Sequence, residues 1–554
     1  MKKRYKALLI IAGLLIVFTA SLRIRVSIDA PVINEKARFN DGDRIKAGND
    51  FYLPGDSWLK KNEYGLWELY VTGDAFELGV KNGILTKELA QYQEEAFVES
   101  LRELIPSDFY LRFLKYFVAW FDRDIDKYIP EEYLKEIYGI SLSASTEYSF
   151  IAPEYQRILN YHAAHDIGHT VNNLGIVACT AFGVKDDRSA DSSLVIGRNM
   201  DFYISDKFAK NKIIAFYKPD SGYKFTFITW GGLIGVITGM NDQGLTVTLN
   251  AARSEIPTSA KTPVTIIARK ILQYASTIEE AEEIASGFDS FVAESFLISS
   301  ARENDFAIIE KSIDTTVLYH PGGNELILTN HFQSNAFKNR KLTIENKKET
   351  ATLYRWKRTK QLLDRKKVHD VNSFVNILRD RRGLDDENIG NGNELAVNQL
   401  IAHHSVVFKP EKLQMWVSVG PYQLGEYIVY DLNKVFSKFS DTAGIVYDSD
   451  LTVPADTFLY SQEYKDFKEY KQMTARIKKA LKDDNDNFIN EKLIEKYGKL
   501  NPDYFYSSYI MGECYKKLGN KSLAEEYYKK ALAMEIPNEP ERNMIREKLI
   551  ELSK

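Results

Sequence analysis

The hydrophobic pattern of the chain changes at Ala178. Before this residue, apolar stretches divided by prolines predict helices over about 76–169. After it, short apolar segments separated by Asp, Asn, Ser and Gly turns predict strands: CTAFGV, SLVIGRNM, KIIAFYK, YKFTFITW, LIGVITGM and LTVTLNA. Helical stretches at 265–286 and 351–379 interrupt further strands without regular alternation. This order favours an α+β fold with antiparallel sheets and segregated helices over a doubly wound sheet.

Length and composition place this pattern in a globular protein of several units. The chain has 554 residues, of which 44% are hydrophobic and 27% charged, and its net charge is -4. This length exceeds what one hydrophobic core usually serves, and the composition excludes global disorder and a multi-span membrane protein. Because no basic excess could hold a polyphosphate backbone, no nucleic acid partner is expected.

No cofactor or metal is expected from the motifs. His165 and His169 are four residues apart and could share a helical face, but no third ligand accompanies them. We therefore interpret them as hydrogen-bonded structural histidines. The glycines at 231, 232 and 235 are not followed by Lys-Ser/Thr, so they form no phosphate loop.

The amino terminus has the pattern of an export signal. Four basic residues among the first six precede an apolar run from Ala7 to Leu22. This arrangement predicts export of the rest of the chain. The small-residue cleavage site is poor, so residues 1–26 are expected to remain as a membrane anchor, with the chain facing the periplasm or cell exterior. Residues 27–65 are polar and weakly periodic, and we interpret them as a tether.

Residues 461–554 are helical in pattern and highly charged. Several of them, from Met511 to Ala531, fall at the offsets of one tetratricopeptide repeat. One repeat is too little for a free-standing solenoid, so this region is expected to be a helical appendage with a possible protein partner. Cys514 lies inside the repeat and is interpreted as a packing residue.

Cys179 is the candidate for chemistry. The chain has two cysteines, too few for a disulfide framework. Cys179 opens the first expected strand, and Arg198 and Asp201 close the second. If these strands are antiparallel neighbours, a guanidinium lies close enough to stabilise a thiolate, and a carboxylate to hold an ammonium group. No histidine is an obvious base, but a cysteine freed at a new amino terminus can use its own α-amino group.

Several segments together resemble a known family. CTAFGV…GRNMDF, TWGGLIGVITGMNDQGLTVTLN and LILTNHF, in this order, resemble the autoproteolytic cysteine amidohydrolases of the penicillin acyltransferase type. These belong to the Ntn-hydrolase superfamily and are related to choloylglycine hydrolases, acid-ceramidase-like and phospholipase-B-like proteins. VTGDAFELGVKNG is similar to the segment that opens the acyltransferase pro-region. The resemblance covers about residues 66–435 and implies a four-layer αββα sandwich.

The resemblance implies catalytic roles for the residues around the pattern change. Cys179 matches the nucleophile, which becomes an amino terminus when the Ala178–Cys179 bond is cut. Arg198 and Asp201 match the residues that flank the thiolate and hold the α-ammonium group.

Three later residues also match the family. Asn250 matches an oxyanion-site residue that acts through its main-chain N–H, and Asn330 matches the side-chain donor to the same oxygen. Arg355 matches a late active-site arginine, and Arg358 is close enough to remain an alternative.

These observations together predict an exported, self-processing enzyme that hydrolyses a linear amide or transfers its acyl group. The substrate is expected to be a small acyl amide. The predicted units are a membrane anchor (1–26), a tether (27–65), a helical pro-region (66–178), a catalytic domain (179–460) and a repeat-like helical region (461–554). The alternative is an inactive adaptor that binds a partner through the C-terminal helices; it is disfavoured because none of the six site residues is missing.

The two self-cleaved chains are expected to stay associated without a covalent bond. The pro-region is rich in large apolar side chains, each worth about 1.5–3 kcal/mol when buried. Those expected to anchor it are Phe113, Leu114, Phe117, Val118 and Trp120.

Overall fold

A computed structural model describes residues 25–34, 37–104, 107–170, 177–202, 205–437, 444–483 and 487–552. In these ranges no helix is long and apolar enough to cross a membrane. The apolar run from Ala7 to Leu22, on which the expected anchor depends, lies outside the described residues.

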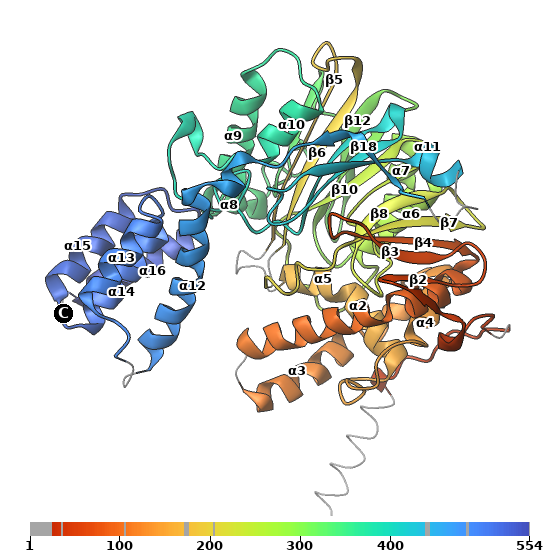
Figure 1. Cartoon of the computed structure of the whole chain (residues 1–554), viewed down its shortest axis with the longest axis horizontal. Helices are drawn as coiled ribbons and strands as arrows, with labels where there is room; N and C mark the ends of the chain where they lie inside the picture. Colours follow the sequence, from red (N-terminus) through yellow and green to blue (C-terminus); the bar gives the residue numbers. More distant parts are fainter. Residues whose placement is uncertain are drawn as a thin grey trace, which may run out of the picture.

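Two β-sheets form the centre of the molecule (Figure 1). In the described ranges the larger sheet has eleven strands, in the order β1 (Ile45–Ala47), β2 (Asp50–Tyr52), β3 (Trp58–Lys61), β4 (Trp67–Gly73), β7 (Ile213–Pro219), β8 (Phe225–Thr229), β9 (Thr238–Asn241), β10 (Leu245–Ala251), β11 (Glu294–Ser300), β12 (Asp305–Lys311) and β13 (Thr316–Tyr319). The smaller has seven there, in the order β14 (Glu325–Leu328), β5 (Val177–Asp186), β6 (Ser192–Phe202), β15 (His404–Lys409), β16 (Gln414–Ser418), β17 (Tyr427–Asp431) and β18 (Tyr447–Val453). Neighbouring described strands are antiparallel except β4 and β7.

Helices cover the outer faces of both sheets. Apolar side chains that alternate along the strands meet between the sheets, among them Ile196, Phe216, Ile308 and Val406. On the outer side of the larger sheet lie α6 (Val264–Tyr274) and α7 (Ile278–Ser286), and on that of the smaller lie α9 (Thr352–Asp364) and α10 (Val371–Leu378). These four layers confirm the αββα sandwich.

One expected strand is shorter than its sequence suggested. In LIGVITGM, strand geometry begins only at Thr238. The preceding residues bond to helices instead, because the Val236 N–H donates to the Thr265 carbonyl (2.9 Å) and the Ile234 N–H to His162 Nε2 (3.1 Å). This apolar run is therefore buried without belonging to a sheet.

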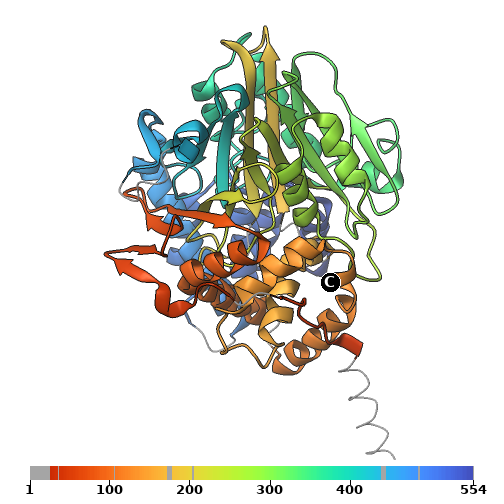
Figure 2. The same cartoon turned by 90° about the vertical axis from the view of Figure 1, so that its right-hand side faces the viewer.

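In the described part of residues 66–170, strand β4 is followed by four α-helices. They are α2 (Ala75–Leu104), α3 (Asp108–Phe121), α4 (Glu131–Ser141) and α5 (Glu154–Thr170), and Figure 2 shows them gathered at one end of the sheets. Strand β4 pairs with β7 along its whole length. Helices α2 and α4 cross closely: a Cβ on Gly139 would lie 2.6 Å from the Phe76 carbonyl oxygen, so only glycine fits there.

The prediction of a tether at residues 27–65 is wrong for much of that range. Strands β1, β2 and β3 lie inside residues 27–65 and extend the larger sheet, with Trp58 and Leu59 buried. Each of these strands has three or four residues, too few for alternation to be visible in the sequence.

The prediction of which residues anchor the pro-region is also wrong in part. Phe117 is 53% exposed and Trp120 is 40% exposed on α3, while Val118 is half-buried. The side chains of Phe113 and Leu114 lie outside the described residues. The buried contacts come instead from α2 and α4, through residues such as Leu78, Ile84, Leu85, Ile137 and Ile140.

The C-terminal helices have a hydrophobic core of their own. They are α12 (Gln462–Lys482), α13 (Glu491–Leu500), α14 (Phe505–Lys517), α15 (Lys521–Leu532) and α16 (Glu539–Leu552), on the left of Figure 1. Helices α14 and α15 form a hairpin that turns at Gly519 (φ 78°). Cys514 is fully buried in this core, which agrees with its interpretation as a packing residue.

Residues 388–404, which we call the connecting segment, join these helices to the smaller sheet. Asn391 donates its main-chain N–H to Asn501 Oδ1 (3.0 Å) and accepts from Asn501 Nδ2 (2.8 Å). Toward the other end, Asn199 of β6 donates to the Val397 carbonyl (3.0 Å). Most of this segment is buried.

Buried carboxyl groups give the fold a predicted pH dependence. Burial raises the pKa of Asp122 to about 8, and those of Glu68 and Asp201 to about 7. Unfolded carboxyls titrate near pH 4, so between about pH 4 and 8 the folded chain binds more protons and its stability falls as pH rises. His162, whose pKa burial lowers to about 4, has the opposite effect only below about pH 6.5.

The thermal unfolding midpoint should therefore drop between about pH 6.5 and pH 8. Circular dichroism of the Cys179→Ala chain measures this without interference from cleavage. Asp122→Asn removes a titrating group of the same shape and should flatten the slope. An unchanged slope in that variant would contradict the assignment.

Candidate active site

Cys179 and Arg198 lie on neighbouring strands. In the β5–β6 pair, Cys179 is opposite Met200 and Ala181 is opposite Arg198. Residues two apart on a strand, and their cross-strand partners, share one face of the sheet, so the thiol and the guanidinium meet. Arg198 Nη2 lies 3.5 Å from Cys179 Sγ.

Arg198 has further acceptors, all uncharged. Its guanidinium donates to the Thr238 hydroxyl and to the Leu249 carbonyl, and Nη1 lies 3.3 Å from His404 Nε2. Within the described part of the chain, no ion pair joins Arg198 to a carboxylate. None of these contacts involves the main chain of Cys179.

Asn330 and Arg355 hold that backbone. The Cys179 N–H donates to Asn330 Oδ1 (3.0 Å), and Arg355 Nη1 donates to the Cys179 carbonyl oxygen (2.6 Å). Arg355 also donates to the Thr180 hydroxyl (2.9 Å) and to Asn330 Oδ1 (2.7 Å). The main chain of Cys179 is thus fixed on both sides of its Cα atom.

The structure distinguishes the two candidate arginines. Arg358, one turn after Arg355 on α9, points away from the site and pairs with Asp380 (2.9 Å) and Asp386 (2.8 Å). Of the two, Arg355 is the one beside Cys179.

Asn250 supports the loop that carries Asn330. Its Nδ2 donates to the carbonyls of Leu328 (3.3 Å) and Thr329 (3.2 Å), at the end of β14. The Asn330 amide donates to the Ala251 carbonyl (2.9 Å). The oxyanion roles of the Asn250 main-chain N–H and of the Asn330 side-chain amide stay predictions. In the uncut chain the Asn330 amide donates to a main-chain oxygen.

Asp201 lies opposite Ala178, next to the expected cleavage point. Gln399 Nε2 donates to Asp201 Oδ2 (3.3 Å), while Oδ1 is buried without a hydrogen-bond partner among the described residues. Burial raises the pKa of this carboxyl to about 7, although Arg355 and Arg198 oppose the shift.

The site is closed in the uncut chain. Cys179 is 2% exposed, and Arg198 and Arg355 are 1% exposed. Burial raises the pKa of the Cys179 thiol, and the opposing effect of Arg198 is smaller. In this state Arg198 lies close to the thiol, as expected, but desolvation has the larger effect on the thiol pKa.

Three further residues contact the site residues and were not expected from the sequence: Thr238, Gln399 and His404. Gln399 and His404 precede or begin β15, which pairs with β6 and places Val406 opposite Arg198. Only the spatial order of the strands brings these residues to the site. The adjacent histidines His403 and His404 were the one signal available in the sequence.

Other histidines have structural contacts. His162 lies 2.8 Å from the Ile158 carbonyl through Nδ1 and accepts from the Ile234 N–H through Nε2. The side chains of His165 and His169 lie outside the described residues. Among described side chains, no group of three His, Cys, Asp or Glu is placed to hold a metal ion.

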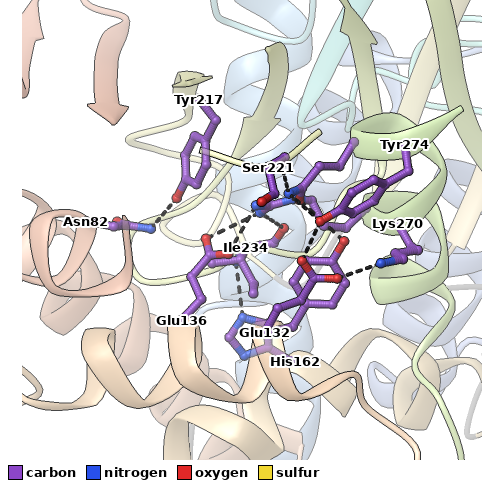
Figure 3. Close-up of polar contacts among 12 residues, drawn as sticks. Asn82, Glu132, Glu136, His162, Tyr217, Ser221, Ile234, Lys270 and Tyr274 are labelled. Atoms are coloured by element: carbon purple, nitrogen blue, oxygen red, sulfur yellow. Dashed lines mark hydrogen bonds and ion pairs between the residues drawn. The ribbon is translucent and has the colours of Figure 1, made fainter. Parts of the chain in front are cut away.

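A polar cluster joins α4 to α6 (Figure 3). Arg269 Nη2 lies 3.0 Å from Glu136 Oε2, and both side chains are almost fully buried. Beside them, Lys270 Nζ and the Tyr274 hydroxyl each lie 2.6 Å from the Glu132 carboxylate, at a partly exposed position. We call these five residues the interface cluster, since they link the chain before Ala178 to the chain after it.

Part of the chain matches one known protein family. Residues 188–422 match the family described as acyl-coenzyme A:6-aminopenicillanic acid acyl-transferase. The matched range contains the five site residues from Arg198 to Arg355 and begins after Cys179.

Individual relatives are distant. The chain is 24% identical over 224 residues to an N-acylethanolamine-hydrolyzing acid amidase from Caenorhabditis elegans, a match that spans 39% of this chain and 59% of that relative. A solved structure described as a Caenorhabditis elegans ortholog of N-acylethanolamine-hydrolyzing acid amidase is 17% identical to this chain. Its TM-score is 0.31, and the match covers 42% of this chain and 93% of that chain. A mutant conjugated bile acid hydrolase from Clostridium perfringens is 15% identical, with a TM-score of 0.31 over 46% and 93%. Residues 188–422 thus match the acyl-coenzyme A:6-aminopenicillanic acid acyl-transferase family over less than half of the chain, and this range lies within the four-layer αββα sandwich.

Proposed function

We propose that the chain is a self-processing cysteine amidohydrolase or acyltransferase that acts on a linear acyl amide. The observation that carries this proposal is that every polar group of Cys179 contacts a residue of the expected set. Its N–H binds Asn330, its carbonyl binds Arg355 and its thiol binds Arg198.

The first step is a cut in the chain itself. Cys179 Sγ attacks the carbonyl carbon of Ala178, the peptide nitrogen leaves as an amine, and water hydrolyses the resulting thioester. The products are a carboxylate at Ala178 and a free α-amino group at Cys179. Asp201 supports this step, because its unpartnered Oδ1 lies in register with Ala178 and would accept a hydrogen bond from the new α-ammonium group.

The second step repeats the attack on an external amide. The α-amine, with a pKa near 7.7–8.0, takes the thiol proton and later protonates the leaving amine. The acyl group passes to Cys179 Sγ and then to water or to an acceptor amine. A substrate with an acyl amide bond fits both the family and the N-acylethanolamine-hydrolyzing relative.

The first chain stays bound after the cut. Strand β4 belongs to the part before Ala178, yet it pairs with β7 of the part after it. The interface cluster adds a buried ion pair between the same two parts.

The test is to express the full chain with and without Cys179→Ala. The unsubstituted chain should yield a second fragment whose first residue is Cys179, and it should hydrolyse one or more members of a panel of N-acyl amides, β-lactams and lysophospholipids. Cys179→Ala should remain one chain and be inactive, and Cys179→Ser should cut slowly. A single uncut chain with full amidase activity would exclude the mechanism.

The same preparation tests location. The proposed anchor at residues 1–26 should keep the first fragment with membranes through an alkaline carbonate wash. Release into the soluble fraction would show that the segment is not retained as an anchor.

A further inference from the structure

One of the side chains that contact Arg198 is a histidine. His404 Nε2 lies 3.3 Å from Arg198 Nη1 and 2.9 Å from the Thr238 hydroxyl oxygen. A guanidinium has only N–H donors, so the ring nitrogen that faces it must be an unprotonated acceptor. His404 therefore carries its single proton on Nδ1.

A second histidine fixes this tautomer. His404 Nδ1 lies 2.8 Å from His403 Nδ1, so the Nδ1–H group of His404 donates a hydrogen bond to His403 Nδ1. The His403 ring packs against Trp230, with 4.2 Å between the ring centroids. Both histidines are buried, and burial, aided by the nearby cations Lys212 and Arg198, lowers their pKa well below the ordinary value.

An uncharged acceptor has a different effect from a carboxylate. A carboxylate at this position would neutralise the guanidinium and weaken its attraction for the thiolate. Two buried carboxyl groups, Glu294 and Asp201, also act on the charge of Arg198, and burial raises the pKa of both. Because the other hydrogen-bond partners of the guanidinium are uncharged, its positive charge acts on Cys179 Sγ, at 3.5 Å.

We propose that His404 is a positioning residue that holds Arg198 through an uncharged acceptor, so that Nη2 stays on the thiol and the guanidinium charge stabilises the thiolate. The proposal rests on the proposed function, in which Cys179 is the nucleophile. In this mechanism His404 contacts neither the thiol nor the substrate, and it acts only through Arg198.

The test compares His404→Gln with His404→Glu. These side chains have the same shape and both present an oxygen near the place of Nε2, but only glutamate is charged. The readout is the rate of Cys179 alkylation by iodoacetamide against pH, followed by mass spectrometry of the peptide that contains Cys179 in the self-cleaved protein. This measures the thiol pKa without any amide substrate.

His404→Gln should keep the wild-type midpoint. His404→Glu should raise the midpoint by about one pH unit, which lowers alkylation near neutral pH about 10-fold. In amide turnover, the glutamate variant should lose kcat with little change in KM.

Equal alkylation midpoints for the two variants would overturn the role of His404. Absence of amide turnover in the unsubstituted protein would count instead against the proposed function. If the glutamate variant fails to fold, Thr238→Val is the second test, since it removes the hydroxyl shared by Arg198 and His404. It should raise the midpoint in the same direction, and an unchanged midpoint would contradict the proposal.

Discussion

Arg355→Leu is expected to abolish self-cleavage and amide turnover, whereas Arg358→Leu should leave both in place. Arg355 binds the Cys179 carbonyl and Asn330 Oδ1, which in turn holds the Cys179 N–H. Loss of one preorganised donor at a reacting centre typically costs about 10²–10³ in rate, so cleavage should slow by at least that factor.

Arg358 is a matched control for this change. It lies on the same helix and is equally buried, but its partners are Asp380 and Asp386. Both variants should lower the thermal midpoint, since each leaves buried polar groups unpaired. Gel electrophoresis over time measures the cleavage rate, and so separates a loss of cleavage from a loss of stability. Equal cleavage rates for the two variants would remove Arg355 from the site.

Arg269→Met should weaken the association of the two self-cleaved fragments far more than Lys270→Met. Arg269 and Glu136 form a fully buried pair, and removal of one partner of such a pair typically costs about 3–5 kcal/mol. That corresponds to about 10²- to 4 × 10³-fold in the association constant. The partly exposed pair of Lys270 and Glu132 is worth about 0–1 kcal/mol.

Size-exclusion chromatography of the self-cleaved protein in increasing urea measures this difference. The unsubstituted protein and Lys270→Met should elute as one peak containing both fragments up to nearly the same urea concentration. Arg269→Met should release the first fragment at a clearly lower concentration. If all three dissociate together, the interface cluster does not hold the fragments.

The sequence predicted local features of the fold better than long-range ones. The α+β class with antiparallel sheets followed from the order of the expected strands and helices, and the four-layer αββα sandwich from a family resemblance. The closeness of Cys179 and Arg198 followed from two consecutive strands, whose antiparallel pairing is the commonest arrangement. Short strands such as β1 and β2 carry too little alternation to be recognised.

The rest of the site depends on tertiary placement. Arg355 and Arg358 are one turn apart, and only the packing of α9 decides which faces Cys179. His404 reaches Arg198 because β15 lies next to β6, although many residues separate them in the chain. In the same way, the aromatic side chains of α3 predicted burial, but Phe117 and Trp120 lie on the outer side of that helix.

The connecting segment makes the C-terminal helices hard to separate from the site by truncation. Asn391 is tied to Asn501 between α13 and α14, and Leu400 packs in the same core as those helices. Gln399, next to Leu400, donates to Asp201. A chain shortened before α12 would uncover Leu400 and loosen Gln399, so its inactivity would say nothing about a partner for the helices. A binding role for the helices is better judged from substitutions on their exposed faces, with amide turnover as the internal standard.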